Sequence, residues 1–160
     1  MCQRLYVASR TELARVKKTE SAPFLDLRAT GEGDAHIREH FPISDFPYLY
    51  VAEAYSPCGC GFPEELPGRR PRKLGPEDMA TMERLVESLR PAVRGRPRVQ
   101  LLLCFIGEED SEMTPGPTIL LNELQSPEFR FRDLEIVTVL KAPWDTTAAS
   151  AVVPRAGQHE

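Results

Sequence analysis

The amino-acid sequence predicts a single-domain α/β (or α+β) sandwich, in which helices pack on a mixed, mainly parallel sheet of about five strands. Short apolar stretches typical of strands alternate along the chain with helical patterns. A length of 160 residues with 41% hydrophobic residues suits one core. The 15 prolines, roughly twice the usual share, punctuate the elements. We place the domain at residues 1–145 and expect residues 146–160, which are small, polar and aperiodic, to form a mobile tail.

The first elements are short. Residues 5–8 form an apolar stretch that predicts a strand. Ser9 and Glu12 have the spacing of a capping box, which predicts a short helix directly after it. Residues 24–27 predict a second strand.

The middle of the chain predicts a helical turn and a third strand. Asp34 is placed to cap a short turn over residues 35–40, which Pro42 ends. Residues 48–52 are rich in aromatic and branched side chains, which favours a strand.

The second half has the clearest patterns. Residues 76–90 predict a helix, because Pro76 suits the first helical position and apolar residues recur at steps of three and four. The predicted buried stripe comprises Met79, Met82, Val86, Leu89 and Val93. Residues 99–106 are almost continuously apolar and predict a central strand covered on both faces. Residues 118–124 predict another helix, and residues 134–140 predict the last strand.

Charge and length limit the classes of function. The net charge of −4 makes nucleic-acid binding unlikely, because such binding relies on a positive surface. No apolar run is long enough to cross a membrane, and the first residues lack a signal segment. We therefore expect a cytoplasmic protein whose four cysteines are thiols or metal ligands rather than structural disulfides. We expect a protein partner or a homodimer rather than a membrane.

The most unusual local sequence is Cys58-Gly59-Cys60-Gly61, between two prolines. Two thiols separated by one glycine are suited to binding a soft metal ion or to forming a reversible disulfide. The alternative is that the glycines only make a tight turn and both cysteines pack as small apolar residues. Cys104, inside an apolar stretch, is expected to be buried and inert.

A zinc site would need further ligands, because structural zinc sites commonly have four. His36 and His40 are four residues apart, which places them on one face of an α-helical turn. With Cys58 and Cys60 they would complete a tetrahedral set. The alternative is a solvated or hydrogen-bonded histidine pair on a short turn.

A second group of candidates depends on a parallel sheet, in which ligands bind beyond the carboxyl ends of the strands. Those ends would bring together the cysteine segment and a set of polar and aromatic residues, namely Arg10, Glu108, Glu109, Asp110 and Trp144. We expect a pocket at this edge, although an acidic run after a strand is more often a solvated turn.

Two hypotheses about function follow. In the first, the protein carries a thiol site, redox or metal-binding, at Cys58 and Cys60. In the second, it is a non-catalytic interaction module that presents the proline-rich region 42–76, which holds seven of the prolines. The common phosphate-loop, zinc-protease and esterase motifs are absent from the sequence, so no enzymatic activity is assigned.

Overall fold

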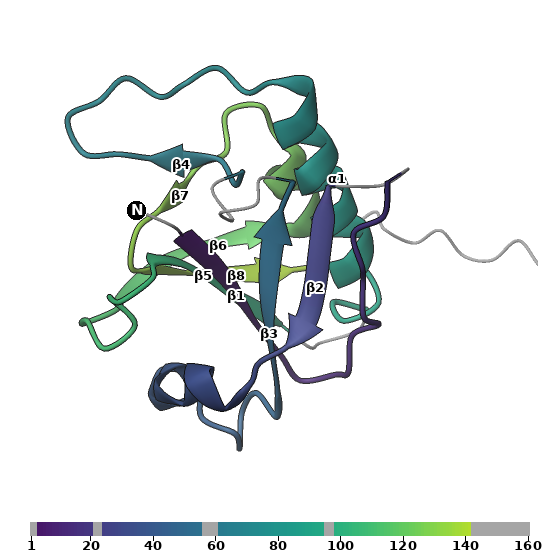
Figure 1. The fold of residues 1–160 in the computed structure, drawn as a ribbon, viewed down its shortest axis with the longest axis vertical. Coiled ribbons are helices and arrows are strands. Elements are labelled where there is room, and N and C mark those ends of the chain that lie inside the picture. The colour runs from purple at the N-terminus through teal and green to yellow at the C-terminus, as the bar shows by residue number, and fades with distance from the viewer. Residues whose placement is uncertain (1–2, 21–23, 56–60, 95–97, 142–160) are drawn as a thin grey trace, which may run out of the picture.

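The computed structural model describes residues 3–20, 24–55, 61–94 and 98–141. At its centre is a six-stranded sheet in the order β2-β3-β1-β5-β8-β6 (Figure 1). The strands are β1 (Gln3–Ser9), β2 (Leu25–Ala29), β3 (Tyr48–Ala54), β5 (Val99–Phe105), β6 (Thr114–Leu120) and β8 (Glu135–Leu140). Within this six-stranded sheet, as far as the structure describes it, only β6 and β8 pair in parallel, and the other four pairings are antiparallel. The expected mainly parallel sheet is therefore wrong, and of the predicted classes α+β fits loosely.

The sheet differs from the predicted, mainly parallel one because two predicted helices are absent from the described residues: the helix after Ser9 and the helix over residues 118–124. After β1, the Ser9 hydroxyl accepts a hydrogen bond from the Thr11 amide at 3.2 Å and donates one to the Thr11 carbonyl at 2.7 Å. This local turn replaces the predicted capping box, and residues 11–19 contain no helix. Without a helical crossover, β1 pairs instead with the later strands β3 and β5.

The second absent helix is the one predicted over residues 118–124. That stretch is divided between the end of strand β6 and a short 3₁₀ helix, η2 (Leu121–Gln125). Pairing of β6 with β8 extends the chain as far as Leu120. Long-range strand pairing has therefore overridden the local helical signal.

One face of the sheet is covered by α1 (Pro76–Leu89) and η2. Helix α1 confirms the prediction for residues 76–90 to within one residue, with Pro76 at its first turn. Its buried side chains include Met82, Val86 and Leu89, as predicted, whereas Met79 is only half-buried. Leu85, which the predicted stripe omitted, is also fully buried.

The opposite face is covered by a 3₁₀ helix, η1 (Glu32–Glu39), and by Phe41 and Phe46 from the loop that follows it. Alternation along β1 supplies both faces: Leu5 packs in the core under α1, and Tyr6 in the core under η1. Strand β5 is buried along nearly its whole length, as expected for a central strand.

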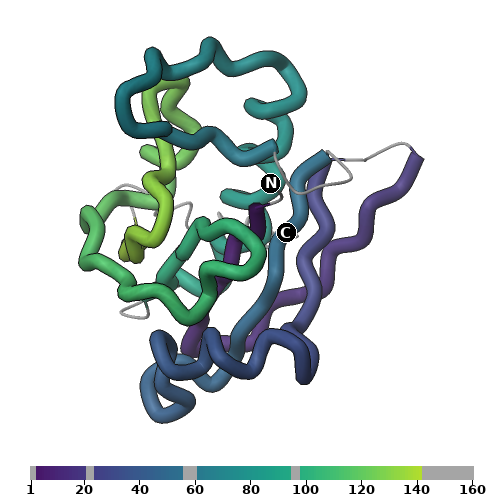
Figure 2. Tube along the Cα trace, turned by 60° about the vertical axis from the view of Figure 1, so that its left-hand side comes forward, coloured from purple at the N-terminus to yellow at the C-terminus, as the bar shows by residue number. Residues whose placement is uncertain are grey.

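Two further strands of two residues each pair in parallel outside the main sheet, β4 (Glu64–Glu65) and β7 (Phe131–Arg132). From β4, residues 66–75 form a long loop that arches away from the sheet before α1 begins (Figures 1 and 2). Within the described ranges, no helix has the length and apolarity needed to cross a membrane.

Candidate functional site

Cys58 and Cys60 lie outside the described residues, but the residues on either side of them are described. Gly61 is packed closely against the end of β3. A Cβ atom added at Gly61 would lie 2.6 Å from the Cβ of Ala54 and 2.9 Å from the ring of Tyr55. Only glycine allows this approach, so the two ends of the cysteine-bearing segment are held against each other.

The two histidines lie at η1, and its geometry differs from an α-helical turn. In a 3₁₀ helix three residues make a turn, so positions four apart, such as His36 and His40, are separated by about 120° around the axis. The Nε2 atom of His40 lies 3.1 Å from the carbonyl oxygen of Glu109. Within the described part of the chain, no group of three or more potential metal ligands is present. The other two members of the predicted set, Cys58 and Cys60, lie outside the described residues.

The polar residues expected at one edge of a parallel sheet are separated in the structure. Because β1 and β5 are antiparallel, Arg10, which follows β1, lies at one end of the sheet. Glu108, Glu109 and Asp110 follow β5 and lie at the other end. Trp144 is outside the described residues. The parallel sheet would have placed Arg10 and the acidic run at one edge, and the antiparallel pairing separates them.

Glu109 instead joins a partly buried polar cluster, which we call the Tyr6 cluster: Arg4, Tyr6, Asp34 and Glu109. The Tyr6 hydroxyl donates to Asp34 Oδ1 at 3.2 Å and approaches Glu109 Oε1 at 3.5 Å. The Arg4 guanidinium donates to Asp34 Oδ1 at 2.9 Å. Asp34 Oδ2 accepts a bond from the Gly31 amide at 3.1 Å, at the start of η1. The cluster therefore joins β1, η1 and the turn after β5.

Burial keeps two groups of this region protonated and unreactive: the Tyr6 phenol of the cluster and the Cys104 thiol, which packs in the same core. Burial raises the pKa of the Tyr6 phenol well above its ordinary value, even though Arg4 opposes the shift. Burial, assisted by the negative charge of Glu109, raises the pKa of the Cys104 thiol to about 12. Cys104 is fully buried, which confirms the expectation for that residue. At neutral pH neither group is ionised, so the cluster is suited to fastening elements together rather than to nucleophilic chemistry.

Sequence reasoning did not group the members of the Tyr6 cluster. One signal was available: Arg4 and Tyr6 are two apart in a strand, so they point to the same face. Asp34 does serve the start of the 3₁₀ helix as predicted, but it does so from the third helical position and with Gly31 as its partner. Pairing Asp34 with Tyr6 depends on contacts across 28 residues, which no local pattern reveals.

The loop over residues 66–75 is a charged segment whose residues 67–73 are all exposed. Its Arg72 guanidinium makes two hydrogen bonds to the Asp78 carboxylate at the start of α1, at 2.6 and 2.7 Å. The Arg72 carbonyl accepts a bond from the Arg130 guanidinium at 2.9 Å. These contacts hold the middle of the loop, while Arg69, Arg70 and Lys73 are all exposed to solvent.

A groove of about 650 Å³ lies between this loop and strand β6. Its apolar lining comprises Pro71, Pro115, Gly116, Pro117, Ile119 and Phe129. Its charged lining comprises Glu65, Glu128, Arg130, Arg132 and Glu135. The proline-rich region 42–76 is therefore not one surface, because strand β3 runs through the sheet and separates the exposed residues 42–45 from the exposed loop over residues 66–75.

Comparison of the chain with protein-family models, with curated proteins and with solved structures finds no match.

Proposed function

We propose that this protein is a non-catalytic interaction module that binds an extended segment of a partner protein between the 66–75 loop and strand β6. The observation that carries the proposal is the exposed cation cluster Arg69, Arg70 and Lys73, on a loop whose middle is held at Arg72. A loop that is already held loses less conformational entropy on binding than a free one. Of the proline-rich region 42–76 that the sequence suggested as an interaction surface, this loop is the part that we expect to contact the partner.

The charges and lining of the groove indicate the chemistry of the partner. The exposed cations attract acidic side chains and accelerate their association, although the protein as a whole carries a charge of −4. The prolines and Phe129 offer apolar contacts. Because three glutamates also line the groove, a uniformly acidic segment is disfavoured. We therefore expect a segment with acidic residues toward the loop and apolar residues toward β6.

Selection from a random 12-residue peptide library displayed on phage tests this proposal. We expect enriched peptides that combine acidic and apolar residues and bind the wild-type protein. Replacing Arg69, Arg70 and Lys73 together by serine is expected to weaken their binding by at least about tenfold, equivalent to about 1.4 kcal/mol. The control removes three exposed cations elsewhere, by serine substitution at Arg10, Lys17 and Arg94.

Two outcomes contradict the interaction module. Either no peptide of this composition is enriched, or the loop variant and the control variant bind the enriched peptides equally well. Because the substituted side chains are exposed, we expect both variants to keep the thermal stability of the wild type to within a few tenths of a kcal/mol.

The thiol site at Cys58 and Cys60 is a second candidate, favoured by the packing of Gly61 against Ala54 and Tyr55. Closing the ends of a five-residue segment that holds two thiols favours a Cys-x-Cys disulfide or a bidentate metal site. We propose it as a redox or soft-metal site on that basis.

Thiol counting in a Cys2→Ser variant tests this candidate, because burial leaves Cys104 unreactive in the folded protein. Two thiols that react only after reduction support a disulfide at Cys58 and Cys60, and a metal that copurifies and is lost in the Cys58→Ser/Cys60→Ser variant supports a metal site. Two thiols that stay unreactive before and after reduction, without metal, contradict both.

A further inference from the structure

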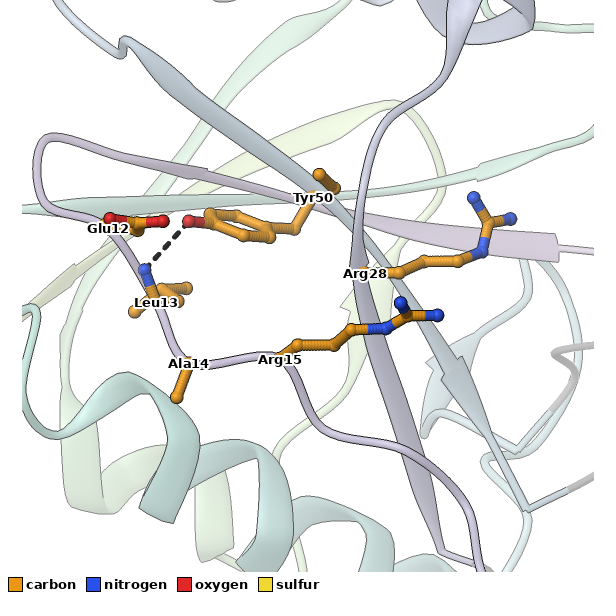
Figure 3. Close-up of a pocket in the computed structure, with 7 residues that line it drawn as sticks. Glu12, Leu13, Ala14, Arg15, Arg28 and Tyr50 are labelled. Carbon is orange, nitrogen blue, oxygen red and sulfur yellow. Dashed lines mark hydrogen bonds between the residues drawn. The ribbon is translucent and has the colours of Figure 1, made fainter.

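Two arginines face each other at the outer edge of β2. Val16 and Leu27 form an antiparallel bridge and exchange two backbone hydrogen bonds, at 3.1 and 2.8 Å. This register places Arg15 directly opposite Arg28, at a position without backbone bonds, where facing side chains lie closest. Figure 3 shows both side chains extending in the same direction, and both line one hollow. Like charges directly opposite each other destabilise a strand pair.

The protein neutralises this pair of charges only in part. The Arg28 guanidinium contacts the Glu53 carboxylate at 3.3 Å, and both side chains are about one-third exposed, so the ion pair is weak. Within the described residues, the exposed guanidinium of Arg15 makes no hydrogen bond or ion pair. Among the residues that the structure describes, at least one positive charge at this position therefore has no counterpart.

The arginines line a hollow of about 630 Å³. The small side chains of Ala14 and Ala29 leave it open, and the Tyr50 ring forms part of its wall. The Tyr50 hydroxyl is held in place by the Leu13 amide, which donates to it at 2.8 Å. Within the described ranges the hydroxyl proton of Tyr50 has no acceptor, so it can be donated to a ligand.

The hollow is electrostatically divided. In Figure 3 the Glu12 carboxylate and the Tyr50 hydroxyl lie at one end, and both guanidinium groups lie at the other. The negative charge of Glu12 is therefore kept away from the two cations. A ligand with one anionic end and one hydrogen-bonding end would match this arrangement.

We propose that Arg15 and Arg28 form an anion clamp, which binds a small molecule through a phosphate or carboxylate group while the body of the ligand lies over Ala14 and Ala29 against Tyr50. The planar, forked guanidinium groups can each offer two parallel hydrogen bonds to such a group. Binding would also relieve the repulsion between the two arginines. The clamp uses no residue of the 66–75 loop, so it stands independently of the peptide-binding proposal.

Inorganic phosphate and succinate serve as separate probes, each compared with sodium chloride at matched ionic strength. We expect at least one of them to raise the melting temperature of the wild-type protein above the chloride value. It should also shift the amide NMR signals of Leu13, Arg15 and Arg28. In Arg15→Gln and in Arg28→Gln, the Kd of that probe should rise by about tenfold or more.

The matched control is Arg94→Gln, which removes an exposed arginine that does not line the hollow. It should bind the probe as the wild type does. Without any probe, Arg15→Gln should melt at the same temperature as the wild type or higher, since it removes a like charge. A purely structural role for Arg15 would give the opposite result.

Each outcome decides something. A response to phosphate alone identifies a phosphate site, and a response to succinate alone identifies a carboxylate site. The proposal is overturned if neither probe exceeds chloride, or if both arginine variants bind the probe as tightly as Arg94→Gln does.

Discussion

Replacing Asp34 by alanine tests the role assigned to the Tyr6 cluster. The carboxylate is nearly buried, with a side-chain exposure of 6%, and it accepts hydrogen bonds from Arg4, Tyr6 and Gly31. Losing the hydrogen bond from the Gly31 amide at the start of η1 destabilises the folded protein by about 1 kcal/mol. Leaving the fully buried Tyr6 hydroxyl with a weaker partner adds about 1–3 kcal/mol. Arg4 is partly exposed and regains water, so its ion pair adds little.

The expected loss of unfolding free energy for Asp34→Ala is therefore about 2–4 kcal/mol. Urea denaturation followed by far-ultraviolet circular dichroism measures it. With a urea dependence of about 2 kcal/mol per molar, the midpoint should fall by about 1–2 M. Asp110→Ala, an exposed carboxylate in the turn that also carries Glu109, is the control and should change stability by less than about 0.5 kcal/mol.

A double-mutant cycle with Tyr6→Phe separates the hydrogen bond from other effects. In the Tyr6→Phe variant the buried hydroxyl is gone, so Asp34→Ala no longer deprives that hydroxyl of its hydrogen-bond acceptor. The double variant should then lose about 1 kcal/mol less than the sum of the two single losses. Strict additivity, or a loss below about 0.5 kcal/mol for Asp34→Ala alone, would refute the proposed fastening role.

Three further predictions concern other positions. Gly61→Ala should destabilise by about 1–3 kcal/mol through overlap with Ala54, whereas Gly33→Ala, with open space around it, should not, as thermal unfolding can show. Burial opposes ionisation of Asp78, but hydrogen bonds from the Arg72 guanidinium and the Gly75 amide outweigh burial and lower the pKa of this carboxyl. The ionised Asp78 should therefore stabilise the fold at neutral pH, and this stabilisation should be lost as the pH falls below about 4. Burial raises the pKa of Asp133, so Asp133→Asn should stabilise at neutral pH and have no such effect in acid, which urea titrations at both pH values can test.

Local patterns predicted the elements that depend on local chemistry. Helix α1 begins at Pro76 and buries its periodic apolar residues, and strand β5 is buried on both faces. Both features follow from residue types within one short window. They are the parts of the fold where propensity and packing agree.

The errors arose where distant contacts decide the structure. Nothing near Ser9 indicates that its hydroxyl bonds to Thr11 instead of capping a helix, or that β1 pairs with β3 and β5. Whether neighbouring strands run parallel or antiparallel therefore could not be inferred from the sequence. The grouping of Arg10 with Glu109 was wrong for the same reason. The clamp formed by Arg15 and Arg28 likewise depends on the Val16–Leu27 bridge, a pairing that the sequence does not signal.

The two outer strands of the sheet have a consequence for behaviour at high concentration. Strand edges with free amide and carbonyl groups recruit strands from other molecules, and this is a common route to aggregation. Along β6, Pro115 and Pro117 cannot donate, and the edge of β2 is already bridged at Leu27 by the chain around Val16. Edge-to-edge pairing of copies is therefore disfavoured at both outer strands, although the loop over residues 66–75 is exposed.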